Sequence, residues 1–319
     1  MTVAELNTPS KATTTGVAFR NILVATDFSD PSRRALCEAL ALAGQHQAQL
    51  SVIHVLHPHR RRGDFENPPE VDGARITAER QIKALLDELR PQEKIGVLIT
   101  QGDAALQVVS VIEEQKVDLL VIGTRGRGGL RKLALGSVAD ELLRIAPCPV
   151  LTIGPQAEVA TVSGGARFHH ILFATDFGKG STKALPLALA LARAEQAQLI
   201  LLHMIPPIPS SSASLSAYAP ATAAADEVTE WEGTYHKRAL QQLKECLPAD
   251  TGVIQEVKYV VGTDFLTEGI LTASVKFKVD LIVMGASRTA SAKMAAHVPW
   301  AAVHEMLRDA PCPVLTVAG

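Results

Sequence analysis

Residues 21–28 read Asn-Ile-Leu-Val-Ala-Thr-Asp-Phe and residues 170–177 read His-Ile-Leu-Phe-Ala-Thr-Asp-Phe, and this near repetition decides the fold. A second phrase, Ala-Pro-Cys-Pro-Val-Leu-Thr, occurs at both 146–152 and 310–316. Self-similarity at a fixed spacing indicates a duplicated structural unit. The chain of 319 residues is therefore a tandem of two copies, each long enough to bury a core of its own.

The two copies differ in length between their landmarks. Asp27 and Asp176 are 149 positions apart, whereas Gly123 and Gly285 are 162 positions apart. The second copy therefore holds about 13 additional residues between its first and fourth strands. They include residues 206–225, a stretch of low complexity rich in Ser, Ala and Pro, which predicts a mobile loop.

Composition is that of an ordinary globular protein. Apolar residues make up 47% of the chain and charged residues 20%, with a net charge of −2. This charge predicts no general attraction to nucleic acid or to anionic membranes. Residues 1–19 show no signal peptide, and no apolar run reaches the roughly 18 residues that span a bilayer. We expect a cytoplasmic protein.

The four cysteines form no Cys-x-x-Cys pair. Cys148 and Cys312 occupy the same position of the repeat, between two prolines and before an apolar strand. This placement predicts small buried side chains rather than metal ligands or disulfides, and so a reducing compartment. The other two are Cys37 and Cys246.

Short apolar runs alternate with helical patterns in both copies. Apolar residues at helical spacing follow Asp30-Pro31, which predicts a helix with Asp30 as N-cap, and residues 76–89 predict a second helix. Apolar strands separated by helices are typical of a parallel sheet that is buried on both faces. Each copy is therefore predicted to be a βαβαβ domain. The expected strands are 22–25, 50–55, 95–100, 119–122 and 150–153 in copy one, and 171–174, 199–204, 257–261, 281–284 and 314–317 in copy two.

The domain boundaries follow from the repeat and from one polar segment. Residues 155–167 are polar and contain glycine, which predicts a linker. We place a flexible N-terminal tail at residues 1–19, the first domain at 20–154 and the second at 168–319.

Ligands of open parallel sheets bind beyond the carboxyl ends of the strands, where the strand order reverses. The loops after the first and fourth strands are therefore the candidates. The first carries Asp27, and the second carries Gly123, Gly126 and Gly136-Ser137 with intervals of two and nine residues. Glycines let backbone N–H groups approach a phosphate, and a helix that starts at Gly136-Ser137 adds amides and the positive end of its dipole. The pattern predicts an anion cradle.

The charge of this loop favours the same interpretation. It holds Arg125, Arg127, Arg131 and Lys132, and residues 119–139 contain no acidic residue. The alternative is that the glycines form a tight turn and the cations a solvated face. The position of Asp27 at the neighbouring strand end favours the anion site.

Together these residues resemble the universal stress protein family. The resemblance covers nearly all of both copies: a strand that ends in Ala-Thr-Asp-Phe, a strand that ends in His-Val, the glycine pattern after strand four, and the Pro-Cys-Pro-Val strand. It implies two tandem Rossmann-like domains, each with a five-stranded parallel sheet in the order 3-2-1-4-5. Members with this glycine pattern bind ATP, and we expect Mg²⁺ with it.

The resemblance also implies roles for individual residues. Asp27 would contact the adenosine end of ATP, and Val55 would meet adenine at its backbone. The glycines with Ser137 and Val138 would hold the ribose and the phosphates. The complete expected site is Ala25, Thr26, Asp27, Val55, Ile122, Gly123, Thr124, Arg125, Gly126, Arg127, Gly136, Ser137 and Val138.

Copy two departs from the pattern at the loop. Counted from Gly285, the second glycine is replaced by Arg288 and the Gly-Ser pair by Val298-Pro299. Counted back from the Pro-Cys-Pro segment, the pair is Trp300-Ala301. Side chains at these positions would obstruct a phosphate, and Pro299 has no N–H group to donate. We therefore expect Asp176 to cap its own loop and the domain to be structural or regulatory.

We find no catalytic constellation, since Walker, Gly-x-Ser-x-Gly and His-Glu-x-x-His patterns are absent from the sequence. His54 and His203 share one strand-end position, which favours packing or hydrogen bonding over catalysis. The leading hypothesis is an ATP-binding stress-response protein. The alternatives are a weak ATP-hydrolysing enzyme and an interaction scaffold without nucleotide.

The last strand of each copy is expected at a sheet edge, and unpaired apolar edges favour strand addition. Strands 150–153 and 314–317 could pair within one chain, as members of the family do between chains. We therefore expect an intramolecular pseudo-dimer, with higher homo-oligomers left open and no nucleic acid or membrane as partner.

Overall fold

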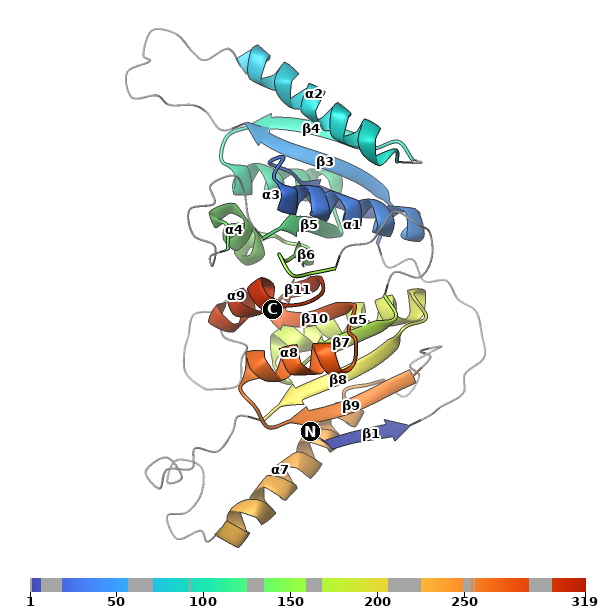
Figure 1. Ribbon diagram of the computed structural model, residues 1–319, viewed down its shortest axis with the longest axis vertical. Coiled ribbons are helices and arrows are strands. Elements are labelled where there is room, and N and C mark those ends of the chain that lie inside the picture. The colour runs from blue at the N-terminus through green and yellow to red at the C-terminus, as the bar shows by residue number, and fades with distance from the viewer. Residues whose placement is uncertain are drawn as a thin grey trace, which may run out of the picture.

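In the computed structural model, two α/β domains share one continuous sheet with helices on both faces (Figure 1). The strand order is β1-β9-β8-β7-β10-β11-β6-β5-β2-β3-β4. The residues that the structure describes are 2–6, 19–56, 71–91, 93–124, 135–158, 168–205, 225–248, 254, 256–286 and 300–319.

Strands and helices alternate along the first domain, and both faces of its strands carry apolar residues. Its elements are β2 (Asn21–Ala25), α1 (Asp30–His46), β3 (Gln49–Leu56), α2 (Val71–Leu89), β4 (Gly96–Gln101), α3 (Ala104–Gln115), β5 (Leu119–Gly123), α4 (Ser137–Ile145) and β6 (Val150–Ile153).

The second domain repeats this succession. Its elements are β7 (His170–Ala174), α5 (Lys179–Ala194), β8 (Gln198–Met204), α7 (Ala225–Glu245), β9 (Glu256–Gly262), α8 (Leu266–Lys276), β10 (Leu281–Ala286), α9 (Trp300–Asp309) and β11 (Val314–Ala318). The low-complexity stretch predicted as a mobile loop lies outside the described residues, except for Ala225.

The predicted strand order is confirmed in both domains. Within each domain all strands are parallel, and the sheet runs 3-2-1-4-5 when its strands are numbered along the chain. The switch point lies between the first and fourth strands, which are β2 and β5 in the first domain. The edge beyond the carboxyl ends of these strands is therefore where a ligand of this fold class binds.

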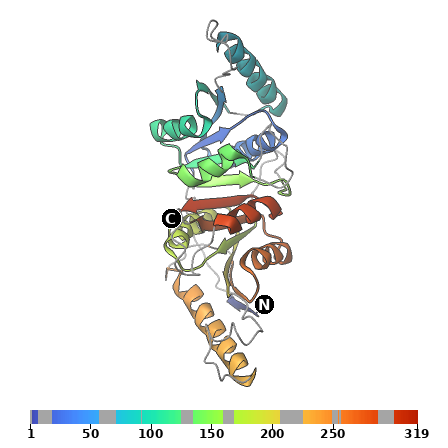
Figure 2. The ribbon, with the colours of Figure 1, turned by 90° about the vertical axis from the view of Figure 1, so that its left-hand side faces the viewer.

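The two domains meet through their last strands, β6 and β11, which pair antiparallel (Figure 2). Leu151 lies opposite Leu315, and the flanking partners are Thr152 with Val314 and Val150 with Thr316. Leu151 thus faces its own equivalent and the two flanking pairs are exchanged, as a local two-fold axis near the leucines requires. This pairing satisfies two strand edges that would otherwise expose unpaired backbone groups.

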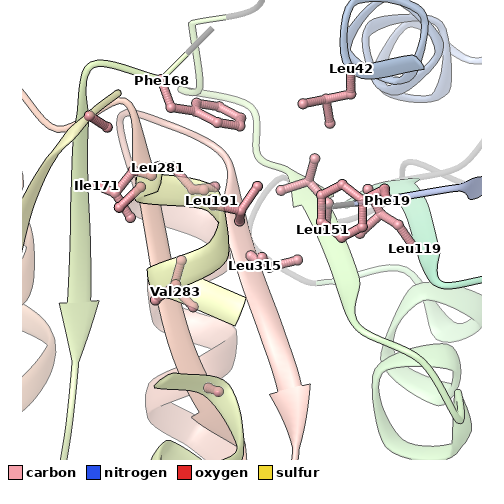
Figure 3. Packing of buried hydrophobic residues seen from close by; sticks show 14 of the residues in the cluster. Phe19, Leu42, Leu119, Leu151, Phe168, Ile171, Leu191, Leu281, Val283 and Leu315 are labelled. Atoms are coloured by element: carbon pink, nitrogen blue, oxygen red, sulfur yellow. The ribbon is translucent and has the colours of Figure 1, made fainter. Parts of the chain in front are cut away.

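Two apolar layers cover the sheet, and each layer contains residues of both domains. On one face, equivalent residues such as Leu42 of α1 and Leu191 of α5 are fully buried with Leu151 and Leu315 (Figure 3). Burial of one such side chain stabilises the fold by roughly 1.5–3 kcal/mol. The layer that joins the domains is thus part of the core.

The N-terminal tail differs from the prediction. Thr2–Leu6 form strand β1, which pairs antiparallel with β9, whereas the sequence predicts a flexible tail over residues 1–19. The edge of β9 carries backbone N–H and C=O groups that any neighbouring extended segment can satisfy. Residues 7–18 lie outside the described residues.

The start of α1 also corrects an expectation. Asp30 is the first helical residue, and Ser29 is the N-cap, because its side-chain oxygen accepts the N–H group of Ser32. Pro31 occupies the first turn, as the sequence predicts.

Candidate functional site

The candidate site lies at the carboxyl ends of β2, β3 and β5 in the first domain. Val55 and Ile122 are buried near the ends of their strands, and Ala25 is partly exposed at the end of β2. Thr26, just beyond β2, donates its N–H group to the carbonyl oxygen of Ile53 at 2.9 Å. This bond holds the start of the following loop against β3.

A tight turn follows Thr26. The hydroxyl oxygen of Thr26 accepts the N–H group of Phe28 at 3.1 Å. The Asp27 carboxylate accepts the N–H group of Ser29 at 3.1 Å and its hydroxyl at 2.5 Å. Phe28 has a φ of 64°, a left-handed conformation that is uncommon for a bulky residue. Asp27 therefore has a structural task in the turn in addition to any contact with a ligand.

His54, near the end of β3, stabilises this turn. Nδ1 of His54 lies 2.7 Å from the carbonyl oxygen of Thr26, and its ring packs on Phe28 with ring centres 4.5 Å apart. A hydrogen bond and a ring contact from one side chain fix the backbone between β2 and α1. The predicted packing and hydrogen-bonding role of His54 is confirmed.

Copy two builds the same turn. Thr175 accepts the N–H group of Phe177 at 2.9 Å, and Phe177 has a φ of 58°. His203 bonds the Thr175 carbonyl oxygen at 2.8 Å, and burial lowers the pKa of His203. Asp176 accepts the N–H group of Gly178 at 2.8 Å, so it caps the loop as expected. This turn belongs to the fold and does not distinguish the two copies.

Gly123, at the end of β5, touches the helix that crosses it. A Cβ atom at Gly123 would lie 2.6 Å from the carbonyl carbon of Pro31. In copy two, a Cβ atom at Gly285 would lie 2.1 Å from the carbonyl carbon of Gly180. The glycine after strand four is therefore required by helix packing in both copies, independently of any ligand.

Thr124 is the residue at which the two copies diverge. Its N–H group donates to the carbonyl oxygen of Ile153 at 3.2 Å, and its own carbonyl oxygen accepts the N–H group of Gly136 at 2.9 Å. The side chain is only 3% exposed, and its hydroxyl has no hydrogen-bond partner among the described residues. A buried hydroxyl without a partner is energetically unfavourable, and a polar ligand at this sheet edge would satisfy it.

Helix α4 begins beside this hydroxyl because the bond from Gly136 ties the helix to the end of β5. Gly136 is the N-cap, and no side chain caps the helix. In the described part of the chain, the N–H groups of Ser137 and Val138 donate to no acceptor. The Gly136 amide is already donated to Thr124, so Ser137 and Val138 are the residues that offer amides to an anion.

A second buried hydroxyl lies at the same edge and was not expected from the sequence. Thr100 of β4 is the neighbour of Val55 in the sheet, and its hydroxyl is buried without a partner in the described chain. By strand register, the equivalent of Thr100 in copy two is Gly262, and the equivalent of Thr124 is Ala286. A comparison of the two copies could have found both threonines, because only copy one has hydroxyls there.

Part of the expected site cannot be placed. Arg125, Gly126 and Arg127 lie outside the described residues, as do Arg131 and Lys132 and the copy-two segment 287–299. The structure brings together the remaining expected residues at one sheet edge. These are Ala25, Thr26, Asp27, Val55, Ile122, Gly123, Thr124, Gly136, Ser137 and Val138.

Other classes of site find little support in the described residues. They contain no group of three or more His, Cys, Asp or Glu side chains placed to hold a metal ion. Cys148 and Cys312 are buried free thiols, as predicted, and burial raises the pKa of Cys148 to about 12. Within the same residues, no helix has both the length and the apolarity to cross a membrane.

Comparison with known families gives two matches along the chain. The sequence model described as the universal stress protein family matches residues 18–154 and again residues 167–318. The two matched segments correspond to the two halves of the sheet.

Individual relatives match a single copy. A universal stress protein of Thermus aquaticus is 34% identical over 138 residues, which is 42% of this chain and 98% of that protein. Universal stress protein A homolog 1 of Coxiella burnetii is 34% identical over 142 residues, 42% of this chain and 96% of that protein.

Solved structures also match the whole tandem. One of them is a universal stress protein from Archaeoglobus fulgidus, with a TM-score of 0.66 and 18% identity over 93% of this chain and 96% of that one. At this identity the likeness shows the fold.

Proposed function

This chain belongs to the universal stress protein family, and on that premise we propose that its first domain binds ATP. The nucleotide would lie at the edge formed by the carboxyl ends of β2, β3 and β5 and the start of α4. The second domain would serve a structural or regulatory role. We place the protein in the cytoplasm as part of the same proposal.

The observation that carries the proposal is the partnerless hydroxyl of Thr124 beside an uncapped helix start. The bond between the Gly136 amide and the Thr124 carbonyl holds the two features together. Amides of a first helical turn and the positive end of the helix dipole favour a phosphate. A phosphate or ribose oxygen would also satisfy the buried hydroxyl, for which the described residues offer no partner.

The family resemblance assigns the other contacts. The backbone of Val55 would meet adenine, and Asp27 would contact the adenosine end. Arg125 and Arg127 would add positive charge at the phosphates. Mg²⁺ is usually held by substrate phosphates with one or two carboxylates, so it would arrive with the nucleotide and needs no preformed metal cage.

The two domains would differ in affinity because their sheet edges differ. Gly262 and Ala286 stand in copy two where Thr100 and Thr124 stand in copy one, so copy two lacks both partnerless hydroxyls. The turn after the first strand of copy two is intact, and its role there is structural. We also propose that the pairing of β6 with β11 takes the place of a dimer between single-domain chains.

A proline substitution separates binding from folding at this site. Ser137 is the first residue of α4, where proline is favoured, and Gly136 has the extended conformation that must precede a proline. Ser137→Pro therefore removes one amide donor without disturbing the helix. We expect unchanged melting without ligand and an affinity for Mg-ATP about 10- to 100-fold lower, because a charge-assisted hydrogen bond is lost.

Ala104→Pro is the matched control. Ala104 is the first residue of α3, and its N-cap Asp103 is also extended. This variant should bind Mg-ATP as the parent does in titration calorimetry. Equal affinity of all three proteins would refute the assigned phosphate site. No binding by the parent chain would favour an interaction scaffold, and sustained phosphate release by the parent would favour an ATP-hydrolysing enzyme.

A further inference from the structure

Two histidine–carboxylate contacts cross the boundary between the domains, and each joins equivalent positions of the repeat. His46 of α1 and Glu195 after α5 are separated by the same 149 positions that separate Asp27 from Asp176. Asp140 of α4 and His304 of α9 are separated by the same 164 positions as Cys148 and Cys312. A residue on a two-fold axis meets its own equivalent, so these contacts lie around the local axis of the β6–β11 pair.

The first contact is buried. Nε2 of His46 lies 3.3 Å from Oε1 of Glu195, at ion-pair distance but without the alignment of a hydrogen bond, and their side chains are 4% and 0% exposed. The other carboxylate oxygen of Glu195 accepts hydrogen bonds from Nε2 of Gln45 at 2.5 Å and from the backbone N–H group of Phe168 at 3.3 Å. The ring of His46 packs edge-on against Phe19. A buried carboxylate is tolerable only with such partners.

The second contact lies on the opposite face of the sheet and is partly exposed. Nε2 of His304 is 2.5 Å from Oδ1 of Asp140. Asp140 also contacts Arg144 one turn further along α4, at 3.2 Å. The first domain thus contributes a histidine on one face and an acid on the other, and the second domain contributes the reverse.

We infer that these two contacts specify which domains pair: a first domain selects a second domain and rejects another first domain. Two first domains would oppose Asp140 to a second Asp140, and would leave His46 against a second His46. Two second domains would bury Glu195 against a second Glu195. Like charges at such positions are unfavourable, most of all where they are buried.

The leucines at the centre of the boundary do not discriminate between these pairings. Leu42 and Leu191 are equivalent and identical, as are Leu151 and Leu315. Backbone pairing between two last strands depends on no side chain. Selection against the wrong partner is supplied by the four charged or titratable residues, because like charges placed against a wrong partner are a common way to add specificity to a self-complementary surface.

An exchange of the residues of one contact in the full-length chain tests the inference. Asp140→His places two histidines in contact, and His304→Asp places two acids in contact. The double variant restores one histidine and one acid, with their positions exchanged. The readout is amide hydrogen exchange of β6 and β11 at the boundary, with β2 and β7 at the domain centres as internal references. Arg144→Gln controls for the lost contact within α4.

We expect faster exchange in β6 and β11 in each single variant, with β2 and β7 unchanged, and recovery in the double variant. The single variants His46→Glu and Glu195→His, at the buried contact, should show a larger effect. Single variants that exchange like the parent would overturn the inference. So would a double variant no better protected than the single ones, because the contact would then be only structural.

Discussion

Gly123 and the backbone of Pro31 lie so close that a Cβ atom on the glycine would be 2.6 Å from the Pro31 carbonyl carbon. The equivalent approach of Gly285 to Gly180 is closer still, at 2.1 Å. The first glycine of the phosphate-loop pattern is therefore kept in a copy that has lost the rest of the pattern. This glycine is required by the packing of α1 and α5 against the sheet, so it is no evidence for a ligand.

This packing predicts a loss of stability in both domains. Gly123→Ala and Gly285→Ala should each lower the free energy of unfolding by about 1–3 kcal/mol, because a methyl group would overlap backbone that cannot move freely. Urea denaturation of the two variants measures this loss of unfolding free energy. Gly44→Ala in α1 is the control, since nothing lies within 4 Å of the added atom. It should leave stability unchanged or raise it by about 0.5–1 kcal/mol, since alanine is the better helix former.

Much of the fold follows from local pattern. Val150–Ile153 begins and ends where the sequence predicts, and the other strands shift by a residue or two at most. Apolar strands between helices require a parallel sheet, and family resemblance supplies the strand order. The edge position of the last strands was expected for the same reason, and their pairing is what two apolar edges in one chain favour.

Three features could not be predicted, because each depends on a contact that forms only in the folded chain. Strand β1 forms because β9 offers it an edge, and nothing local marks Thr2–Leu6 as its partner. Ser29 rather than Asp30 caps α1, because Asp27 anchors the Ser29 hydroxyl. The pairing of His46 with Glu195 becomes visible only when the two copies are folded against each other.

The hydroxyl of Thr124 predicts opposite changes in stability and binding. Thr124→Val removes a buried polar group that has no partner among the described residues, so the unliganded chain should gain on the order of 1 kcal/mol in unfolding free energy. If ATP occupies the site, its affinity should fall in the same variant. Thermal melting with and without Mg-ATP measures both changes.

The control for this variant is Thr175→Val, whose hydroxyl accepts the Phe177 N–H group. This variant should lose stability, because a hydrogen bond of the turn disappears. A Thr124→Val chain that is destabilised without ligand would show that its hydroxyl is engaged in the folded protein.

The paired strands β6 and β11 are not equivalent in their hydrogen bonds. The Thr316 hydroxyl donates to the carbonyl oxygen of Val150 at 3.2 Å, whereas the hydroxyl of the equivalent Thr152 has no partner in the described chain. Thr316→Val should therefore cost about 0.5–1.5 kcal/mol, and Thr152→Val should be neutral or stabilising. Urea denaturation compares them. Equal losses would mean that both hydroxyls bond across the boundary.

Cys148 predicts a weakening of the fold at high pH. Burial raises the pKa of its thiol from the ordinary value near 9.0 to about 12. Above pH 9 the unfolded thiol loses its proton while the folded one keeps it, so each further pH unit should lower stability by about 1.4 kcal/mol. Cys148→Ala should be less stable at pH 8 but should lose less stability between pH 8 and 10.5. Urea denaturation at each pH gives the free energy of unfolding of both proteins. Parallel curves of this free energy against pH would contradict the burial of the thiol.

The last prediction is one tightly bound nucleotide per chain. Copy two has Ala286 and Gly262 where copy one has the partnerless hydroxyls of Thr124 and Thr100. Pro299, in the segment that replaces the Gly-Ser pair, has no amide to donate. Loss of two charge-assisted hydrogen bonds, roughly 1.5–3 kcal/mol each, would weaken binding at least a hundredfold. Calorimetry of the full chain should therefore give a stoichiometry near one, and Ser137→Pro should weaken that single site. Two sites of similar affinity, or one site insensitive to Ser137→Pro, would place the nucleotide elsewhere.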